Sequence, residues 1–104
     1  MIRLKKFGTN YSLINQIERS AGSIMDNIAE GFERGGNKEF IQFLFIARGS
    51  CGELRSQAYR ALDDNYISKT EFDNIYIQCS KVNRLIYSLI SYLKNSDKKG
   101  MKFN

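Results

Sequence analysis

The sequence predicts an all-α protein, an antiparallel up-and-down helical bundle of three long helices plus a short N-terminal piece. Three observations support this prediction. Apolar residues recur at steps of three and four along three stretches, a spacing that puts their side chains on one face of an α-helix. Glycines and capping residues separate the stretches. The apolar stripes of the second and third stretches also agree in register, as those of packed antiparallel helices should.

The first long helix is expected at about residues 12–33, with Ser12 or a neighbour as its N-cap. Before it, residues 1–8 look like the last turn or two of another helix. The long helix ends at Gly35 and Gly36, which can adopt the positive φ angles that close a helix C-terminus. Its apolar stripe consists of Ile17, Ala21, Ile24 and Ile28.

The second helix is expected at about residues 38–63, with Asn37 as its N-cap. Its apolar stripe consists of Phe40, Leu44, Ala47, Cys51, Leu54 and Ala58. A second face carries Phe45, Gly49, Gly52 and Ser56. A mid-helix glycine costs roughly 1 kcal/mol relative to alanine, so small residues on this face favour a close approach by another helix. A neighbouring subunit is the partner that we expect there.

The third helix has the clearest start. Ser68 and Glu71 fit a capping box, and Ile67 and Phe72 fit the hydrophobic staple that often accompanies it. The helix is expected to run to about Asn95, followed by a frayed tail over residues 96–104. Its apolar stripe consists of Phe72, Ile75, Cys79, Val82, Ile86, Leu89 and Leu93.

Pairing across the two turns gives a register for each helix pair. Around the loop near residue 65, every predicted pair is apolar on both sides, and Cys51 falls opposite Cys79 as two buried free thiols. The other pairs are Ala58 with Phe72, Leu54 with Ile75, Ala47 with Val82 and Leu44 with Ile86. Around the glycine turn, the same reasoning places Gln16 opposite Glu53.

Polar residues of the first two helices are interpreted as structural. The register sets Glu30 beside Glu39, where unpaired N–H groups and the helix dipole favour an anion, so Glu30 is expected to cap the second helix, supported by Asn27 and Arg34. A cross-helix cluster that fixes the register is expected from Gln16, Arg19, Ser50 and Glu53. Both groups are interpreted in this way in preference to catalysis.

A long signature within these helices resembles a known family. It reads SI-x-x-NIAEG-x-x-R from Ser23 to Arg34, then EF-x-x-FL-x-IA-x-GS-x-x-EL from Glu39 to Leu54. It resembles the four-helix-bundle proteins encoded in intervening sequences of bacterial 23S ribosomal RNA genes, and it is similar to the accessory variability determinant of diversity-generating retroelements. The match covers roughly residues 12–93. The resemblance implies a four-helix bundle with a truncated first helix and a basic cyclic pentamer that works with a reverse transcriptase and nucleic acid. A cytoplasmic location is expected from the absence of a visible secretory signal.

The net charge of +5 suggests a polyanionic partner. The excess charge lies at the ends: residues 1–8 and 94–104 each carry +3, whereas residues 9–93 carry −1. The chain is expected to be one domain over 1–104 with basic tails at 1–8 and 96–104. Such tails are either solvated or in contact with nucleic acid, and the sequence leaves both readings open.

Candidate nucleic-acid contacts lie on the second and third helices. Arg48 and Arg55 share a face that Tyr59 continues, a combination that suits phosphate binding and base stacking as well as a solvated surface. The third helix carries a polar stripe of Lys81, Arg84, Ser88 and Ser91. The remaining candidates are Lys94, Lys98 and Lys99.

No residue pattern indicates catalysis or a cofactor. The chain has no histidine, two cysteines, no Glu-x-x-His pair and no phosphate-binding loop after a strand, so neither a metal nor a cofactor is expected. No apolar stretch is long enough to span a membrane, and no secretory signal is visible. The function that we predict is a non-catalytic homo-oligomer that binds RNA or DNA. The alternative is a protein-interaction scaffold or an accessory subunit, for example of a reverse transcriptase, without direct nucleic-acid binding.

Overall fold

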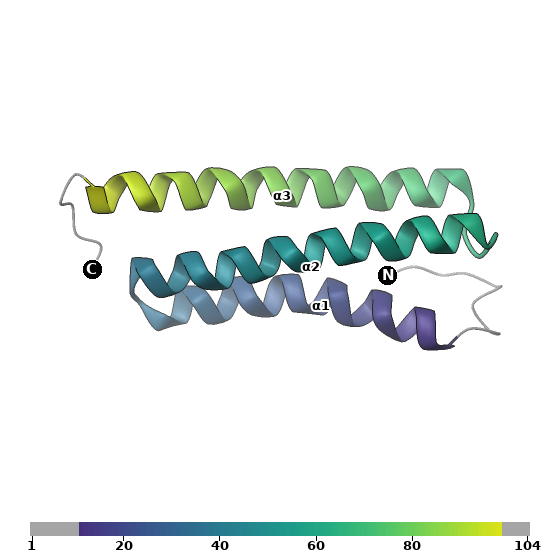
Figure 1. Ribbon diagram of the computed structural model, residues 1–104, viewed down its shortest axis with the longest axis horizontal. Helices are drawn as coiled ribbons and strands as arrows, with labels where there is room; N and C mark the ends of the chain where they lie inside the picture. The colour runs from purple at the N-terminus through teal and green to yellow at the C-terminus, as the bar shows by residue number, and fades with distance from the viewer. Residues whose placement is uncertain (1–10, 99–104) are drawn as a thin grey trace.

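The computed structural model describes residues 11–98 as three helices joined by two short turns. They are α1 (Tyr11–Arg34), α2 (Asn37–Asp63) and α3 (Lys69–Lys98) (Figure 1). The described residues include no strand, so the all-α class predicted from the sequence is confirmed. The expected N-terminal piece at residues 1–8 lies outside the described part.

Helix α2 lies between the other two helices. Figure 1 shows the chain reversing direction at both turns, with α2 in the middle of an elongated layer. The molecule measures 52 × 20 × 15 Å along its principal axes. Helix α2 packs against both α1 and α3, whereas no Cα atom of α1 lies within 8 Å of one in α3. Two sides of α2 are therefore covered within the chain, and the side away from the core stays open.

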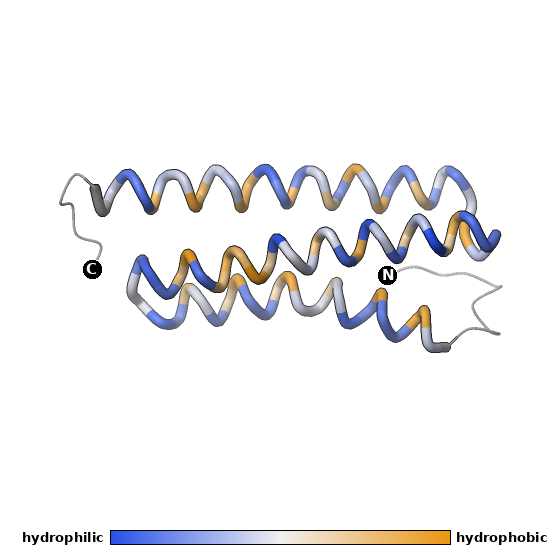
Figure 2. Tube along the Cα trace, in the orientation of Figure 1, coloured by the Kyte–Doolittle hydropathy of each residue, from blue (hydrophilic) through white to orange (hydrophobic). Residues whose placement is uncertain are grey.

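The core follows the predicted stripes except at Ala21, which lies at the edge of the α1 stripe and is exposed, whereas Ser20 and Leu13 on the other side of that stripe are buried. Figure 2 shows apolar residues recurring at intervals along all three helices, as the steps of three and four require. The largest fully buried side chains are Leu13, Leu44 and Cys51. Alongside them, the buried apolar set contains Ile17, Ile24, Ala47, Leu54, Ala58, Ala61, Ile67, Phe72, Cys79, Ile86, Ile90 and Leu93.

Cys51 and Cys79 are buried free thiols, as predicted. Burial raises the pKa of both thiols above the ordinary value of 9.0, and Cys51 adds a further raising effect on the pKa of Cys79. The charge of Arg55 opposes these effects at both thiols. The influence of Cys51 on the pKa of Cys79 agrees with the predicted pairing of the two cysteines across α2 and α3.

The two thiols are expected to resist alkylation in the folded protein. Attack requires the thiolate, and burial both disfavours the thiolate and blocks the reagent. Because the folded thiols keep their protons to higher pH than unfolded ones, stability is at its full value below about pH 9 and declines as the pH rises further. Iodoacetamide labelling at pH 8, with and without denaturant, measures the protection. Equal labelling in both conditions would contradict it.

The α1–α2 turn uses its two glycines differently. Gly35 has a φ of 80°, the left-handed conformation predicted for the end of α1. Gly36 is extended, with φ −111° and ψ 141°, and is the N-cap of α2. The prediction of Asn37 as N-cap is therefore wrong by one position, since Asn37 is the first residue of the helix. Gly36 provides no side-chain capping hydrogen bond.

The α2–α3 turn closes one helix and opens the next. Asn65 adopts a left-handed φ of 62°, and the N–H groups of Asn65 and Tyr66 donate to the carbonyls of Leu62 and Ala61 at 3.0 and 2.8 Å. This is the Schellman pattern of a helix C-terminus.

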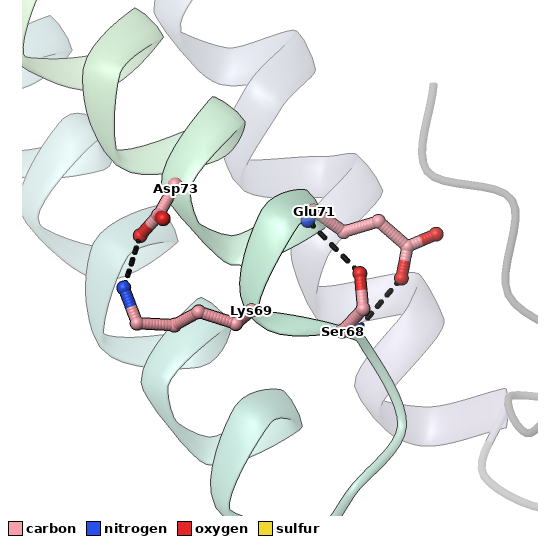
Figure 3. Close-up of polar contacts among 4 residues, drawn as sticks. All are labelled: Ser68, Lys69, Glu71 and Asp73. Carbon is pink, nitrogen blue, oxygen red and sulfur yellow. Dashed lines mark hydrogen bonds and ion pairs between the residues drawn. The ribbon is translucent and has the colours of Figure 1, made fainter.

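The capping box at the start of α3 is confirmed. The Glu71 N–H donates to Ser68 Oγ at 3.1 Å, and the Ser68 N–H donates to Glu71 Oε1 at 2.8 Å (Figure 3). One residue further on, Lys69 Nζ pairs with Asp73 Oδ1 at 2.7 Å.

Removing this cap should weaken the fold measurably. The Ser68→Ala variant leaves the Glu71 N–H without its side-chain acceptor, and N-cap losses of this kind cost about 1 kcal/mol. Urea unfolding followed by circular dichroism measures the change. Ser88→Ala, at an exposed position in the middle of α3, is the control and should not destabilise the protein. Equal midpoints for Ser68→Ala and the wild type would contradict the capping role.

The register prediction holds for α2–α3 only near their turn, and it fails for α1–α2. Arg55 contacts Tyr76, close to the predicted pairing across that loop, but farther from the turn Arg48 contacts Tyr87, more than one turn beyond its predicted level at Val82. In contrast, Gln16 accepts a hydrogen bond from Arg60 at 3.2 Å, two turns beyond the predicted partner Glu53. Ser23 contacts Ser50 at 2.9 Å, about one turn from its predicted level. Side chains in a helix point toward the N-terminus of that helix. In two antiparallel helices they point in opposite directions, so residues whose side chains touch have Cα atoms at different levels along the bundle.

Helix α3 is longer than predicted. It continues to Lys98, so residues 96–98 belong to the helix, and Ser96 is buried. Nothing described tests the predicted tail beyond residue 98. Over the described residues, no helix combines the length and apolar character needed to cross a bilayer.

Candidate nucleic-acid interface

A line of cation–π contacts follows the seam between α2 and α3. The guanidinium of Arg48 lies 5.8 Å from the centroid of the Tyr87 ring, and that of Arg55 lies 5.8 Å from the Tyr76 ring. In each pair the cation comes from α2 and the ring from α3. Contacts at this distance are attractive because the ring face carries negative charge.

Cation–π contacts with other arrangements lie at both ends of the seam. At one end, Lys94 Nζ of α3 lies 5.4 Å from the Phe45 ring of α2. At the other end, Lys69 Nζ lies 5.9 Å from the Phe72 ring of the same helix. Tyr59 of α2 completes this end, since its ring centroid lies 4.7 Å from that of Phe72. The cation–aromatic row is defined here as Phe45, Arg48, Arg55, Tyr59, Lys69, Phe72, Tyr76, Tyr87 and Lys94.

Helical spacing explains why these residues meet. On α2 the row follows steps of three, seven and four from Phe45 to Tyr59, which stay on one side of a helix with 3.6 residues per turn. On α3 the steps from Lys69 through Tyr76 and Tyr87 to Lys94 are seven, eleven and seven, which have the same property. On each helix, the residues of the row lie beside the buried apolar stripe. Both sets therefore border the seam between α2 and α3.

The rings of the row are accessible to solvent. Phe45, Tyr59, Tyr76 and Tyr87 are between 39% and 63% exposed, whereas Phe72 is buried beneath Tyr59 and Tyr76. An exposed aromatic ring beside a fixed cation offers a stacking surface and a positive charge together. This combination is suited to nucleic acid.

The middle of the row has an open backbone. A Cβ atom at Gly49 or Gly52 would meet nothing within 4 Å. These glycines are therefore not required by packing within the chain, although each costs roughly 1 kcal/mol relative to alanine in a helix. On α3, one turn before Tyr87, the Oδ1 atom of Asn83 is buried and has no hydrogen-bond partner in the described structure. This stretch can accept close approach by another molecule.

Only some of the predicted contact residues belong to the row. Arg48, Arg55 and Lys94 are part of it. Lys81 and Arg84 are exposed on α3 but take part in none of its contacts. The helix contains Lys98, whose side chain is not described, and Lys99 lies outside the described residues.

The sequence analysis missed the aromatic members on α3 and the role of Lys69. Their steps of seven and eleven can be read from the sequence. That the tyrosines lie opposite Arg48 and Arg55, and so form cation–π contacts, follows only from the structure.

A polar groove lies on the other side of α2, against α1. Its volume is about 680 Å³ and it is open to solvent. Asn27 Nδ2 donates to the Ser23 carbonyl at 2.8 Å and lies 3.0 Å from Ser23 Oγ, which in turn contacts Ser50 Oγ. The lining residues are Gln16, Arg19, Ser20, Gly22, Ser23, Asp26, Asn27, Glu53 and Gln57. Among the described residues no group of three or more His, Cys, Asp or Glu side chains could hold a metal ion.

A family model described as "23S rRNA-intervening sequence protein" matches residues 2–88. The chain belongs to this family of 23S rRNA-intervening sequence proteins. Among solved structures, it is similar to a protein of unknown function from the S23 ribosomal protein family of Bacteroides thetaiotaomicron, whose crystal structure was determined at 1.70 Å resolution. The two are 26% identical, the match covers 80% of this chain and 77% of the other, and the TM-score is 0.76. Comparison with curated proteins gave no match.

In this intervening-sequence protein, the predicted polar cluster is only partly assembled. Ser50 is buried and its hydroxyl donates to the Ile46 carbonyl at 3.3 Å in addition to contacting Ser23. Arg19 and Glu53 line the same groove, in agreement with their predicted proximity. Gln16 also lines it but binds Arg60, as the shifted register requires.

Glu30 does not have the predicted capping role. Its Oε2 atom accepts a hydrogen bond from Arg34 Nε at 2.9 Å within α1, and about half of each side chain is exposed. Glu30 and Arg34 lie four residues apart on one helix, so their pairing does not depend on the position of α2. The predicted cap required a register between α1 and α2 that the structure does not have. Arg34 also lies 5.1 Å from the centroid of the Phe43 ring, which holds it against α2.

Gly31 of the signature lies where α2 closely approaches α1. A Cβ atom there would lie 2.7 Å from Phe43 Cβ and 2.9 Å from Phe40 Cδ1. Gly31 is buried, in contrast to the exposed Gly49 and the half-buried Gly52 of α2. The signature therefore contains a glycine that packing requires, a role that its sequence context alone did not reveal.

Proposed function

We propose that this protein is a non-catalytic homo-oligomer that binds nucleic acid, RNA or DNA, through the cation–aromatic row and the neighbouring basic residues. The observation that carries the proposal is the alternation of cations and exposed rings along one seam. Phosphates attract the cations, and bases stack on the rings.

The length of the row supports a polymeric partner. Lys69 and Lys94 are 25 residues apart on one helix, which corresponds to about 37 Å at a rise of about 1.5 Å per residue. A small anion would engage one cation, whereas a nucleic acid strand can follow the row along its whole length. Lys69 is partly neutralised by Asp73, while Arg48 and Arg55 are in contact with rings.

Exposed apolar side chains support self-association. Large apolar residues on α1 and α3 remain more than half exposed, which favours an interface. They include Met25, Phe32, Leu85 and Tyr92. The lack of contact between α1 and α3 supports the antiparallel four-helix bundle implied by the family resemblance, with a further helix packing against both. A cyclic pentamer, also implied by the resemblance, would carry a net charge of about +25, five times the charge of one chain.

Two measurements test the proposal. Light scattering after size exclusion at low micromolar concentration should give a mass several times 12.0 kDa. Retention of a nucleic acid should fall steeply with salt, because binding releases the counterions of the phosphates. A monomer of 12.0 kDa would contradict the assembly. Absence of nucleic-acid binding at low salt would contradict the proposal that the ligand is a nucleic acid.

The exposed apolar residues also favour a second candidate function, a protein-interaction scaffold or an accessory subunit of an enzyme such as a reverse transcriptase. In that case the basic residues serve solubility. A partner complex that survives high salt and buries apolar surface, without retention of nucleic acid, would support this alternative over the first.

A further inference from the structure

We infer that the cation–aromatic row selects single-stranded nucleic acid over duplex, and that unpaired bases stack on Tyr76 and Tyr87. This inference rests on the proposed function and narrows its ligand to one class. The relevant observation is the exposure of rings at the seam, each beside a cation from the facing helix.

The preference for single strands follows from what the rings can reach. In a duplex, the faces of the bases are covered by their neighbours, and only base edges are accessible in the grooves. An aromatic ring on a convex helical surface cannot enter the stack without unpairing bases. In a single strand, the bases are free to turn outward and to lie on a ring, while the phosphates stay on the solvent side.

The cations fix the rings for this purpose. Arg48 and Arg55 come from α2, so each contact ties an α3 ring to the facing helix and limits its rotation. A ring held in place loses less freedom when a base stacks on it. The guanidinium stays partly exposed beside the ring, since Arg48 and Arg55 are only half-buried, and it remains available to a phosphate.

The middle of the row provides the space that a strand needs between the two tyrosines. Tyr76 and Tyr87 are separated by eleven residues, about 16 Å along the helix. Between these levels α2 presents Gly49 and Gly52, where no side chain fills the space near the backbone.

Fluorescence anisotropy with labelled probes tests the inference directly. The probes are an oligouridine and an oligothymidine of about 12 nucleotides, long enough to cover the row even at the duplex spacing of about 3.4 Å per nucleotide, and a duplex of the same length. We expect each single strand to bind at least about tenfold tighter than the duplex. Comparing the two single strands distinguishes RNA from DNA as the preferred form.

Substitutions separate stacking from charge. Tyr76→Leu and Tyr87→Leu should each weaken single-strand binding by about tenfold and leave duplex binding unchanged. Tyr76→Phe and Tyr87→Phe keep the ring and should retain binding. The matched control is Tyr66→Leu, the same change at a half-buried tyrosine of the α2–α3 turn, outside the row and outside the exposed apolar set. Circular dichroism melts confirm that each variant is folded.

Intrinsic fluorescence provides an independent readout. The chain has six tyrosines and no tryptophan, so its emission comes from tyrosine alone. Stacking on Tyr76 and Tyr87 should quench this emission on addition of oligouridine, and each leucine variant should lose the part of the quenching that comes from its own tyrosine. Equal affinity for the duplex and the single strands, with no quenching, would overturn the inference and leave the proposed function standing. Binding of no probe at low salt would overturn both.

Discussion

Replacing Gly31 by alanine is expected to destabilise the fold by about 1–3 kcal/mol, the usual cost of overpacking. The added methyl group would lie 2.7 Å from Phe43 Cβ, an atom fixed to the backbone of α2. The Phe40 ring at 2.9 Å can rotate away, but Phe43 Cβ cannot move unless the two helices separate. Urea unfolding measures the loss as a lower midpoint.

Gly22→Ala is the matched control for this prediction. Gly22 is a second interior glycine of α1, and a Cβ atom there would meet nothing within 4 Å. Alanine is the better helix former by about 1 kcal/mol, so Gly22→Ala should stabilise the same helix that Gly31→Ala destabilises. If both variants shift the midpoint in the same direction, packing at Gly31 is not what requires the glycine.

The double variant Arg48→Gln and Arg55→Gln is expected to lose most nucleic-acid binding. Both cations lie in the centre of the row, and each contact with a phosphate of a single strand contributes about 0.7 to the slope of log affinity against log salt. The slope should therefore become shallower by about 1.4, and the affinity at low salt should fall by one to two orders of magnitude. Filter binding over a range of salt concentrations measures both quantities.

The control for this prediction removes the same amount of charge elsewhere. Lys81→Gln with Arg84→Gln neutralises two exposed cations of α3 that take part in none of the contacts of the row. This pair should change the slope less than the Arg48 and Arg55 pair does. Equal losses in both double variants would mean that overall charge, and not the row, attracts the nucleic acid.

Local signals in the sequence determined the helices and the pairing of α2 with α3 near their turn. The capping box of Ser68 and Glu71 involves residues three positions apart, so its geometry depends only on the helix that it starts. The pairing of Cys51 with Cys79 was predictable because both stripes are strictly periodic and the loop between them is short. The shared face of Arg48 and Arg55 also follows from periodicity alone.

Contacts between helices were decided only by the tertiary structure. The α1–α2 register differs from the predicted one because the lean of side chains toward each N-terminus offsets contacting residues, and Glu30 consequently pairs with Arg34 in place of capping α2. The need for glycine at Gly31 depends on how closely the α2 backbone approaches. The cation–aromatic row exists because α3 places its tyrosines opposite the arginines of α2. Periodicity within one helix gives the direction of a side chain, but which side chain it meets depends on how far the neighbouring helix is shifted and rotated.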